Sequence, residues 1–209
     1  IRPMEDRDVA DVVRLHRAAM GNSLWAKLGG GFLSEIYRGL LAHPDFLAYV
    51  YLEDGRVRGF IAGSSDGPRM LSDVQRRRVP RLALATLRGL WRRPEALRPL
   101  LETFRYFRES AAPGEEVRAE SMFCSFEPNL RGKKISGLIN KVLFDELARR
   151  GHRYVKITTE EDNEGAVRQL TSWGFERVGT FRFYGKPMLV WRLDLLECER
   201  VDHPQRKQP

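Results

Sequence analysis

The chain has 209 residues, of which 42% are hydrophobic and 31% charged, with a formal net charge of +8. These values are typical of a water-soluble globular protein with one large domain, and no apolar run reaches the roughly 18 residues that a membrane span needs. The only two cysteines, Cys124 and Cys198, exclude a disulfide framework and a cysteine-rich zinc site, so we expect a cytoplasmic protein without a metal.

The positive charge raises the question of nucleic-acid binding. The chain carries 36 Lys and Arg against 28 Asp and Glu, but it shows no helix-turn-helix pattern, zinc-finger spacing or aromatic RNA-binding signature. We therefore expect no nucleic-acid partner. The first residue is Ile1 rather than Met, which leaves open a trimmed start or a longer parent protein.

The first 63 residues predict a strand, two helices and a β-hairpin. Apolar residues recur at helical spacing around His16, which is expected to be a packing residue of the first helix. The run Glu53-Asp54-Gly55 is a strong turn signal between two apolar segments. The expected elements are a strand at 1–4, a helix at 8–20, a helix from 32 to the His43-Pro44 pair, and strands at 46–52 and 57–63.

Residues 67–115 interrupt this pattern with an arginine-rich, helix-forming segment. Leucine and aromatic residues recur at helical spacing, and eleven arginines lie between Arg69 and Arg108. We expect a helical insertion. It could pack on its own domain, cover a large or hydrophobic substrate, dock an acidic carrier protein, form a homodimer interface or lie on an anionic membrane.

The rest of the chain predicts alternating strands and helices. Gly174 is placed to end a helix. The expected elements are strands at 119–126, 154–158, 180–184 and 188–195, and helices at 138–150 and 163–173. We therefore predict one domain at 1–195, followed at 196–209 by a polar, proline-containing tail that is expected to be disordered.

A basic, glycine-containing turn lies between the strand expected at 119–126 and the helix that follows. Such a turn brings free backbone N–H groups and the positive end of a helix dipole to one point, which suits a phosphate or pyrophosphate. Lysine and arginine side chains add cationic groups. The residues of the turn are Arg131, Gly132, Lys133, Lys134, Ile135, Ser136 and Gly137.

This turn belongs to a longer string that resembles a known signature. The string Phe126-Glu127-Pro128-Asn129-Leu130-Arg131-Gly132-Lys133-Lys134 is similar to the acyl-CoA-binding motif of the GNAT superfamily of N-acyltransferases. A second run, Glu161 to Ala166 followed by Trp173 to Gly179, resembles the family's helix beside the pantetheine arm of the cofactor. The resemblance covers 1–63 and 117–195 and leaves the insertion outside it.

The resemblance implies an α/β fold: a strongly twisted, mixed sheet of about seven strands with helices on both faces. Two neighbouring parallel strands, ending at Phe126 and Thr158, would splay and admit acetyl-CoA or another acyl-CoA. The edge of the first strand would pair with the pantetheine amides like an added strand. The implied donor-binding residues, besides those of the turn, are Cys124, Ser125 and Phe126 on the strand, and Asn163 and Ala166 on the following helix.

Two departures from the family pattern bear on activity. Lys134 and Ser136 stand where the family has small residues, so the turn either tolerates any residue with α-region backbone angles or binds the donor more weakly. Leu170 stands where the family often carries a tyrosine that protonates the departing thiolate. The thiol of coenzyme A has a pKa of about 8.5, like that of cysteine, so loss of this acid need not abolish turnover.

Amide formation needs a base, because an amine acceptor arrives mostly as an ammonium ion. Glu120 is the candidate base, since it starts the cofactor-binding strand where the family often has a carboxylate; the alternative is a surface carboxylate. Tyr184 is the candidate acid, with an aromatic core residue as the alternative. Cys124 could form a covalent acyl-cysteine, but no paired histidine motif supports that route.

The sequence leaves two functions open. The first is an N-acyltransferase that moves an acyl group, most simply acetyl, from acyl-CoA to a primary amine of a small molecule, amino sugar or peptide by direct attack. The second is a catalytically weak or inactive module that binds acyl-CoA or docks a partner through its insertion. Neither the acceptor nor the oligomeric state follows from the residues.

Overall fold

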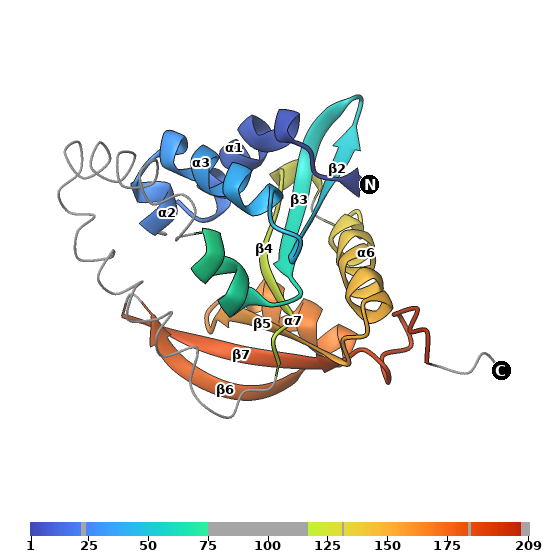
Figure 1. Ribbon diagram of the computed structural model, residues 1–209. Helices are drawn as coiled ribbons and strands as arrows, with labels where there is room; N and C mark the ends of the chain where they lie inside the picture. Colours follow the sequence, from blue (N-terminus) through green and yellow to red (C-terminus); the bar gives the residue numbers. More distant parts are fainter. Residues whose placement is uncertain (22–23, 75–116, 131, 184, 206–209) are drawn as a thin grey trace.

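One seven-stranded sheet organises the computed structural model, which describes residues 1–21, 24–74, 117–130, 132–183 and 185–205 (Figure 1). The strand order is β1-β2-β3-β4-β5-β7-β6. Neighbouring strands are antiparallel except for β4 and β5, which run parallel, so the sheet is mixed as expected. The strands are β1 (Arg2–Pro3), β2 (Phe46–Glu53), β3 (Arg56–Ser64), β4 (Glu120–Phe126), β5 (Tyr154–Glu160), β6 (Glu176–Phe183) and β7 (Lys186–Asp194).

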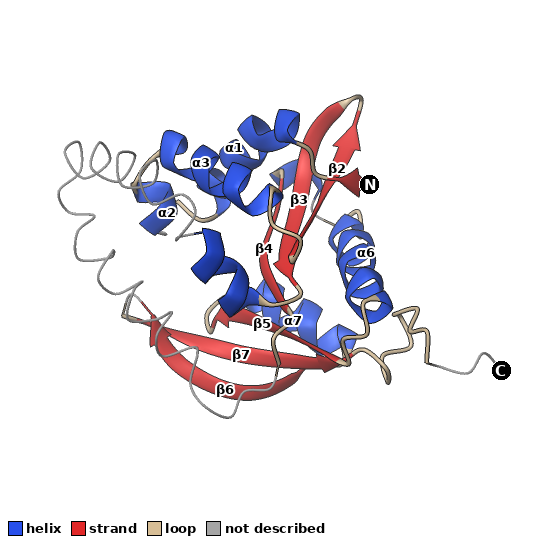
Figure 2. Ribbon diagram, in the orientation of Figure 1, coloured by secondary structure: helices blue, strands red, loops and turns tan. Residues whose placement is uncertain are grey.

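Helices cover both faces of this sheet (Figure 2). α1 contacts β3 and β4 on one face, whereas α6 contacts β2, β3 and β4 on the other. The short α2 was not predicted, because its four residues make about one helical turn and show no hydrophobic periodicity. The helices are η1 (Asp6–Asp8), α1 (Val9–Ala19), α2 (Leu24–Lys27), α3 (Gly30–Leu41), η3 (Pro128–Leu130), α6 (Ile135–Arg149) and α7 (Glu164–Trp173).

The alternation of side chains along β3 divides the core into two layers. Phe60 and Ala62 belong to the hydrophobic cluster under α1 and α3, and Ile61 between them belongs to the cluster under α6 and α7. β3 is thus apolar on both faces because both faces are covered. His16 of α1 is buried, and its Nδ1 lies 2.8 Å from the Tyr37 hydroxyl. The prediction that His16 is a packing residue is confirmed.

Local turn chemistry fixes several element ends. Asp54 and Gly55 have positive φ values of 52° and 73°, as the two-residue type I′ turn between β2 and β3 requires. Gly174, with φ of 84°, ends α7 in the left-handed conformation, as predicted. α6 begins at Ile135, three residues earlier than expected, because the end of the basic turn is itself helical.

The predicted insertion begins inside the domain core. Residues 67–74 are helical, and Met70 and Val74 are buried in the cluster under α1 and α3. The rest of the predicted insertion, 75–115, lies outside the described residues. The alternatives for its role therefore stay predictions.

The segment after β7 differs from the disordered tail expected at 196–209. In its described part, through residue 205, Cys198 and Val201 are buried in the cluster under α6 and α7. The Asp202 N–H donates to Asp145 of α6 at 2.9 Å, and the Asp202 carboxylate pairs with Lys141. The apolar residues of this segment are too sparse to form a periodic pattern, but they anchor it beside α6.

Candidate active site

β4 and β5 pair at only two positions and then part. Glu120 lies opposite Lys156, and Ser121 lies opposite Ile157. Beyond these pairs, residues 122–126 of β4 have no partner on β5, although β3 continues to pair on their other side. Figure 2 shows the two strands meeting near one end and diverging from there. The splayed strands predicted from the family resemblance therefore occur here, and β5 leaves the edge of β4 uncovered beyond Ser121.

A β-bulge lies at the point where the strands part. Ala62 of β3 pairs with Phe123, whereas the next residue, Gly63, pairs with Ser121, so Met122 is the extra residue of β4. Met122 and Phe123, although consecutive, both pack against the cluster under α1 and α3. The bulge thus changes the alternation of side chains on β4 at the same residue where its pairing with β5 ends.

The three donor-site residues expected on β4 have different surroundings. Ser125 is buried, and its hydroxyl donates to the Leu15 carbonyl at 3.2 Å, while Phe126 packs in the cluster under α6 and α7. Cys124 is reached by solvent, yet the surrounding protein desolvates its thiol and raises the pKa to about 12. At neutral pH this thiol is protonated and a poor nucleophile, which argues against an acyl-cysteine route.

The basic turn presents several backbone N–H groups at the start of α6. Gly132 and Lys134 have positive φ values of 81° and 58°, and the helix follows at once. In the described part of the chain, the N–H groups of Gly132, Lys134, Ile135 and Ser136 find no backbone acceptor. Gly137 differs from the prediction, because its N–H donates to the Lys134 carbonyl at 3.1 Å. Among the described residues, these N–H groups are therefore available to an anion at a helix N-terminus.

The backbone of Lys134 bears on the alternatives stated for the basic turn. One of the two alternatives for this turn required α-region angles, but φ of 58° and ψ of 11° lie in the left-handed region, which only glycine enters freely. Lys134 therefore adopts, with strain, a backbone conformation that favours glycine. Lys133 pairs with Glu53 of β2 at 3.5 Å and remains half exposed. Arg131 lies outside the described residues.

The start of α7 brings Asn163 and Ala166 together. The Asn163 Oδ1 accepts from the Ala166 N–H at 3.1 Å, so Asn163 is the N-cap of the helix. The cap uses the oxygen of the carboxamide and leaves its NH2 group for a ligand. Leu170, one helical turn beyond Ala166, is 7% exposed and packs in the cluster under α6 and α7. Tyr184 lies outside the described residues, so its role stays a prediction.

Glu120 and Lys156 form an ion pair where the strands part. Lys156 is only 8% exposed, and its Nζ lies 4.0 Å from the Glu120 Oε2. A Cβ added to Gly67 would lie 3.2 Å from the same carboxylate oxygen, so Glu120 lies against the first turn of the helix at 67–74. Lys156 was not among the predicted site residues. The available signal was a lysine between Val155 and Ile157 in a buried strand.

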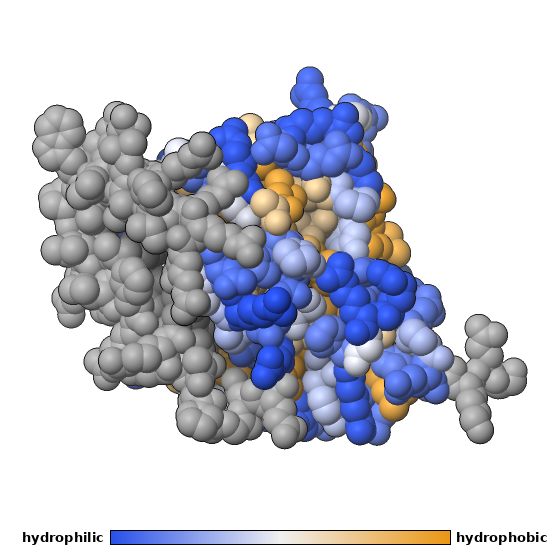
Figure 3. All heavy atoms as spheres, viewed as in Figure 1, coloured by the Kyte–Doolittle hydropathy of each residue, from blue (hydrophilic) through white to orange (hydrophobic). Residues whose placement is uncertain are grey.

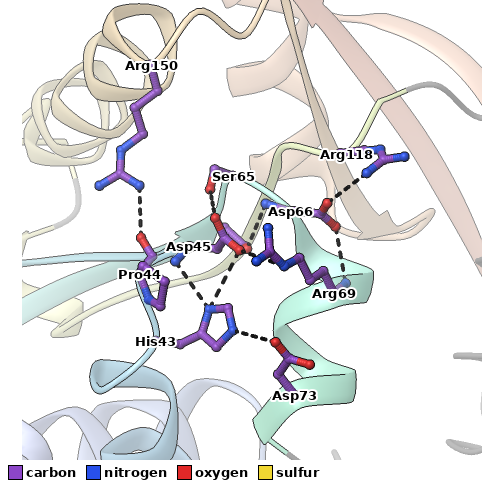
Figure 4. Close-up of polar contacts among 10 residues, drawn as sticks. His43, Pro44, Asp45, Ser65, Asp66, Arg69, Asp73, Arg118 and Arg150 are labelled. Carbon is purple, nitrogen blue, oxygen red and sulfur yellow. Dashed lines mark hydrogen bonds and ion pairs between the residues drawn. The ribbon is translucent and has the colours of Figure 1, made fainter.

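A polar network holds the helix at 67–74 beside the start of β4 (Figure 4). The His43 Nδ1 accepts from the Asp45 N–H at 3.2 Å, and its Nε2 lies 3.4 Å from Asp73 on that helix. Asp66 accepts from the Arg118 Nη1 at 3.1 Å. We expected His43 only to end a helix; it is instead a buried link between the α3–β2 turn and the insertion.

The surface of the described residues is mostly hydrophilic in the view of Figure 3, with small separate hydrophobic areas. Within the described ranges, no group of three or more His, Cys, Asp and Glu side chains is arranged to hold a metal ion. None of the described helices is long and apolar enough to cross a membrane.

The fold has counterparts among solved structures, although no protein-family model and no curated protein matches the sequence. Over 92% of its length the chain is similar to the ribosomal-protein-alanine N-acetyltransferase from Brucella melitensis, with 18% identity, a TM-score of 0.60 and 98% of that chain covered. Over the same share of its length the chain is similar to an N-acetyltransferase from Staphylococcus aureus Mu50, with 14% identity, a TM-score of 0.59 and 96% of that chain covered. It is also similar to an acetyltransferase of the GNAT family from Streptococcus pneumoniae, with 12% identity, a TM-score of 0.55 and 96% of that chain covered. The parted strands, the basic turn and these likenesses agree: the chain has the fold of the GNAT N-acyltransferases.

Proposed function

We propose that the chain is an N-acyltransferase that moves an acyl group, most simply acetyl, from acyl-CoA to a primary amine. The parting of β4 and β5 beside a basic turn is the observation that carries the proposal. A chain of amides can pair with the edge of β4 that β5 leaves uncovered, and a pyrophosphate suits the backbone N–H groups of the basic turn at the start of α6. Acyl-CoA contains both of these groups in one molecule.

Glu120 supplies the base in this proposal. Its carboxylate removes a proton from the acceptor ammonium, directly or through water, so that the nitrogen can attack the thioester carbonyl. A backbone N–H on the β4 edge that β5 leaves uncovered stabilises the negative charge that develops on the carbonyl oxygen. The position supports this role, because Glu120 is the first of the two β4 residues that pair with β5, next to the point where the strands part.

The acceptor in this proposal is an amine of a small molecule, an amino sugar or a peptide, in the cytoplasm. Peptides merit testing because one similar structure is, by name, a ribosomal-protein-alanine N-acetyltransferase. The acyl group is open to the same test, since acetyl-CoA and longer acyl-CoAs share the pantetheine and pyrophosphate that the site suits.

Two measurements on the purified chain test the proposal. Calorimetric titration with acetyl-CoA and longer acyl-CoAs is expected to give micromolar binding, weakened when Lys133 is replaced by Met. A thiol-release assay with a panel of amines, including peptides that begin with alanine, is expected to show amine-dependent turnover. Lys141→Met is the matched control, because Lys141 is a surface lysine of α6 that pairs with Asp145 and Asp202.

An acyl-CoA-binding module without turnover is the second candidate. Two observations favour it: Leu170 is buried where an acid is expected, and Lys134 is strained in the turn. Micromolar binding without thiol release for any amine would support the module. Absence of binding would refute both candidates and direct attention to the insertion as a docking surface.

A further inference from the structure

The tyrosine that often protonates the departing thiolate in the resembled family is replaced by Leu170 in this chain, and the predicted acid Tyr184 lies outside the described residues. Leu170 occupies the position of the family's tyrosine and is buried in the core, so no side chain there can act. A thiolate whose conjugate acid has a pKa of about 8.5 can leave unaided, but a well-placed acid speeds such a step by roughly 10²- to 10⁴-fold. Another acid near the point where β4 and β5 part would therefore matter.

Lys156 has the position and chemistry of such an acid. It lies on β5 directly opposite Glu120, and residues opposite each other in a sheet project to the same face. Its ammonium is 4.0 Å from the Glu120 carboxylate, and the side chain is almost fully buried. A buried lysine is costly unless its charge is compensated, and Glu120 compensates it at this point.

We propose that Glu120 and Lys156 form a proton relay, an inference that rests on the proposed acyltransferase function. Amide formation removes two protons from the acceptor ammonium. Glu120 passes the first to solvent and takes the second from the nitrogen as the C–N bond forms. The C–S bond breaks with its electron pair on sulfur, and Lys156 donates a proton to that sulfur. Protonated Glu120 then returns its proton to the neutral Lys156 amine through one intervening water, since their 4.0 Å separation is too long for a direct transfer, and both side chains regain their charges.

A purely electrostatic role for Lys156 makes different predictions. An ammonium that only holds Glu120 in its charged form can be replaced by the guanidinium of arginine. Arginine cannot act as the donor, because its pKa exceeds about 12. A donor also matters most for a basic leaving group. An aromatic thiolate, which is far less basic, leaves without a proton.

The test compares Lys156→Arg, Lys156→Met, the control Lys141→Met and the unaltered chain. Each is assayed with acetyl-CoA and with an acetyl thioester of nitrothiobenzoate. Both Lys156 variants should lose at least roughly 10²-fold in kcat with acetyl-CoA. On the aromatic thioester they should keep kcat/KM within about threefold of the unaltered chain. Acetyl-CoA titration and thermal unfolding of every variant distinguish loss of a proton donor from loss of binding or fold.

Three outcomes overturn the relay. Full activity of Lys156→Arg, or an equal loss on both thioesters, would leave Lys156 as an electrostatic partner only. Failure of the unaltered chain with every amine refutes the proposed function, and the relay with it.

Discussion

Gly59 on β3 and Phe126 on β4 lie opposite each other, and the phenyl ring occupies the space over the glycine. A Cβ at position 59 would lie 2.2 Å from the Phe126 Cδ1, so no larger residue fits without moving the ring. Phe126 is the last residue of β4 before the chain enters the basic turn. The glycine therefore sets the position of the ring at the end of the strand.

Gly59→Ala is expected to lower the free energy of unfolding by about 1–3 kcal/mol, because the added methyl overpacks the contact with Phe126. Urea denaturation measures the change. The double variant with Phe126→Leu should recover part of the loss, since leucine lacks the ring edge that meets the methyl. Strictly additive losses in the two variants would show that Phe126 is not the cause.

Lys134→Gly is expected to raise the free energy of unfolding by up to about 1 kcal/mol. Relief of the left-handed strain, about 1–2 kcal/mol, outweighs the extra chain entropy of glycine, about 0.5–1 kcal/mol. Lys133→Gly is the control, because Lys133 has negative φ and should lose stability. A less stable Lys134→Gly would mean that the lysine side chain makes a compensating contact. Acetyl-CoA titration of Lys134→Asn shows whether the charge itself contributes to binding.

Asn163 allows its cap and its ligand contact to be separated. Asn163→Ala removes the acceptor for the Ala166 N–H and should cost about 1 kcal/mol of stability. Asn163→Asp keeps an oxygen for the cap but has no NH2 group. It should retain stability and bind acetyl-CoA more weakly, as measured by calorimetry. Equal binding by Asn163→Asp and the unaltered chain would exclude a donor role for the carboxamide.

His16 should make stability depend on pH. Burial lowers its pKa to about 4, whereas an exposed histidine has a pKa of about 6.5. His16 therefore binds a proton more readily in the unfolded chain than in the folded one. Its contribution to the free energy of unfolding is fully present above about pH 6.5. It declines as the pH falls from about 6.5 to about 4, by roughly 3 kcal/mol in all.

Urea denaturation at a series of pH values measures this decline. In His16→Gln, whose carboxamide can still bond the Tyr37 hydroxyl, the decline over this window should be much smaller. An unchanged decline in that variant would assign the pH dependence to other groups.

The sequence predicts those parts of the fold in which local chemistry decides the structure. The Asp54-Gly55 turn, the Gly174 helix end and the apolar stripe around His16 each depend on residues close in the chain. The packing of Cys198 and Val201 on α6 depends on distant residues instead. No local pattern distinguishes two such anchors from a polar tail.

The candidate site divides in the same way. The basic turn follows from a short motif and was predicted, whereas Asn163 was predicted as a donor-binding residue and its cap of α7 was not. The strain at Lys134 depends on a backbone angle that cannot be predicted from the residue type. The Glu120–Lys156 pair depends on the register of two strands that are distant in sequence. A lysine in a buried strand is unusual in the sequence, but only the strand register shows which carboxylate it pairs with.

The junction of β4 and β5 also has a mechanical consequence. Four strands on one side and three on the other are continuous across the sheet through two residue pairs, those of Glu120 and Ser121. Because only two backbone pairs cross this line, the two halves can rock about it as about a hinge. An occupant between the strands would brace that hinge, so amide exchange at residues 120–126 should slow when a donor binds.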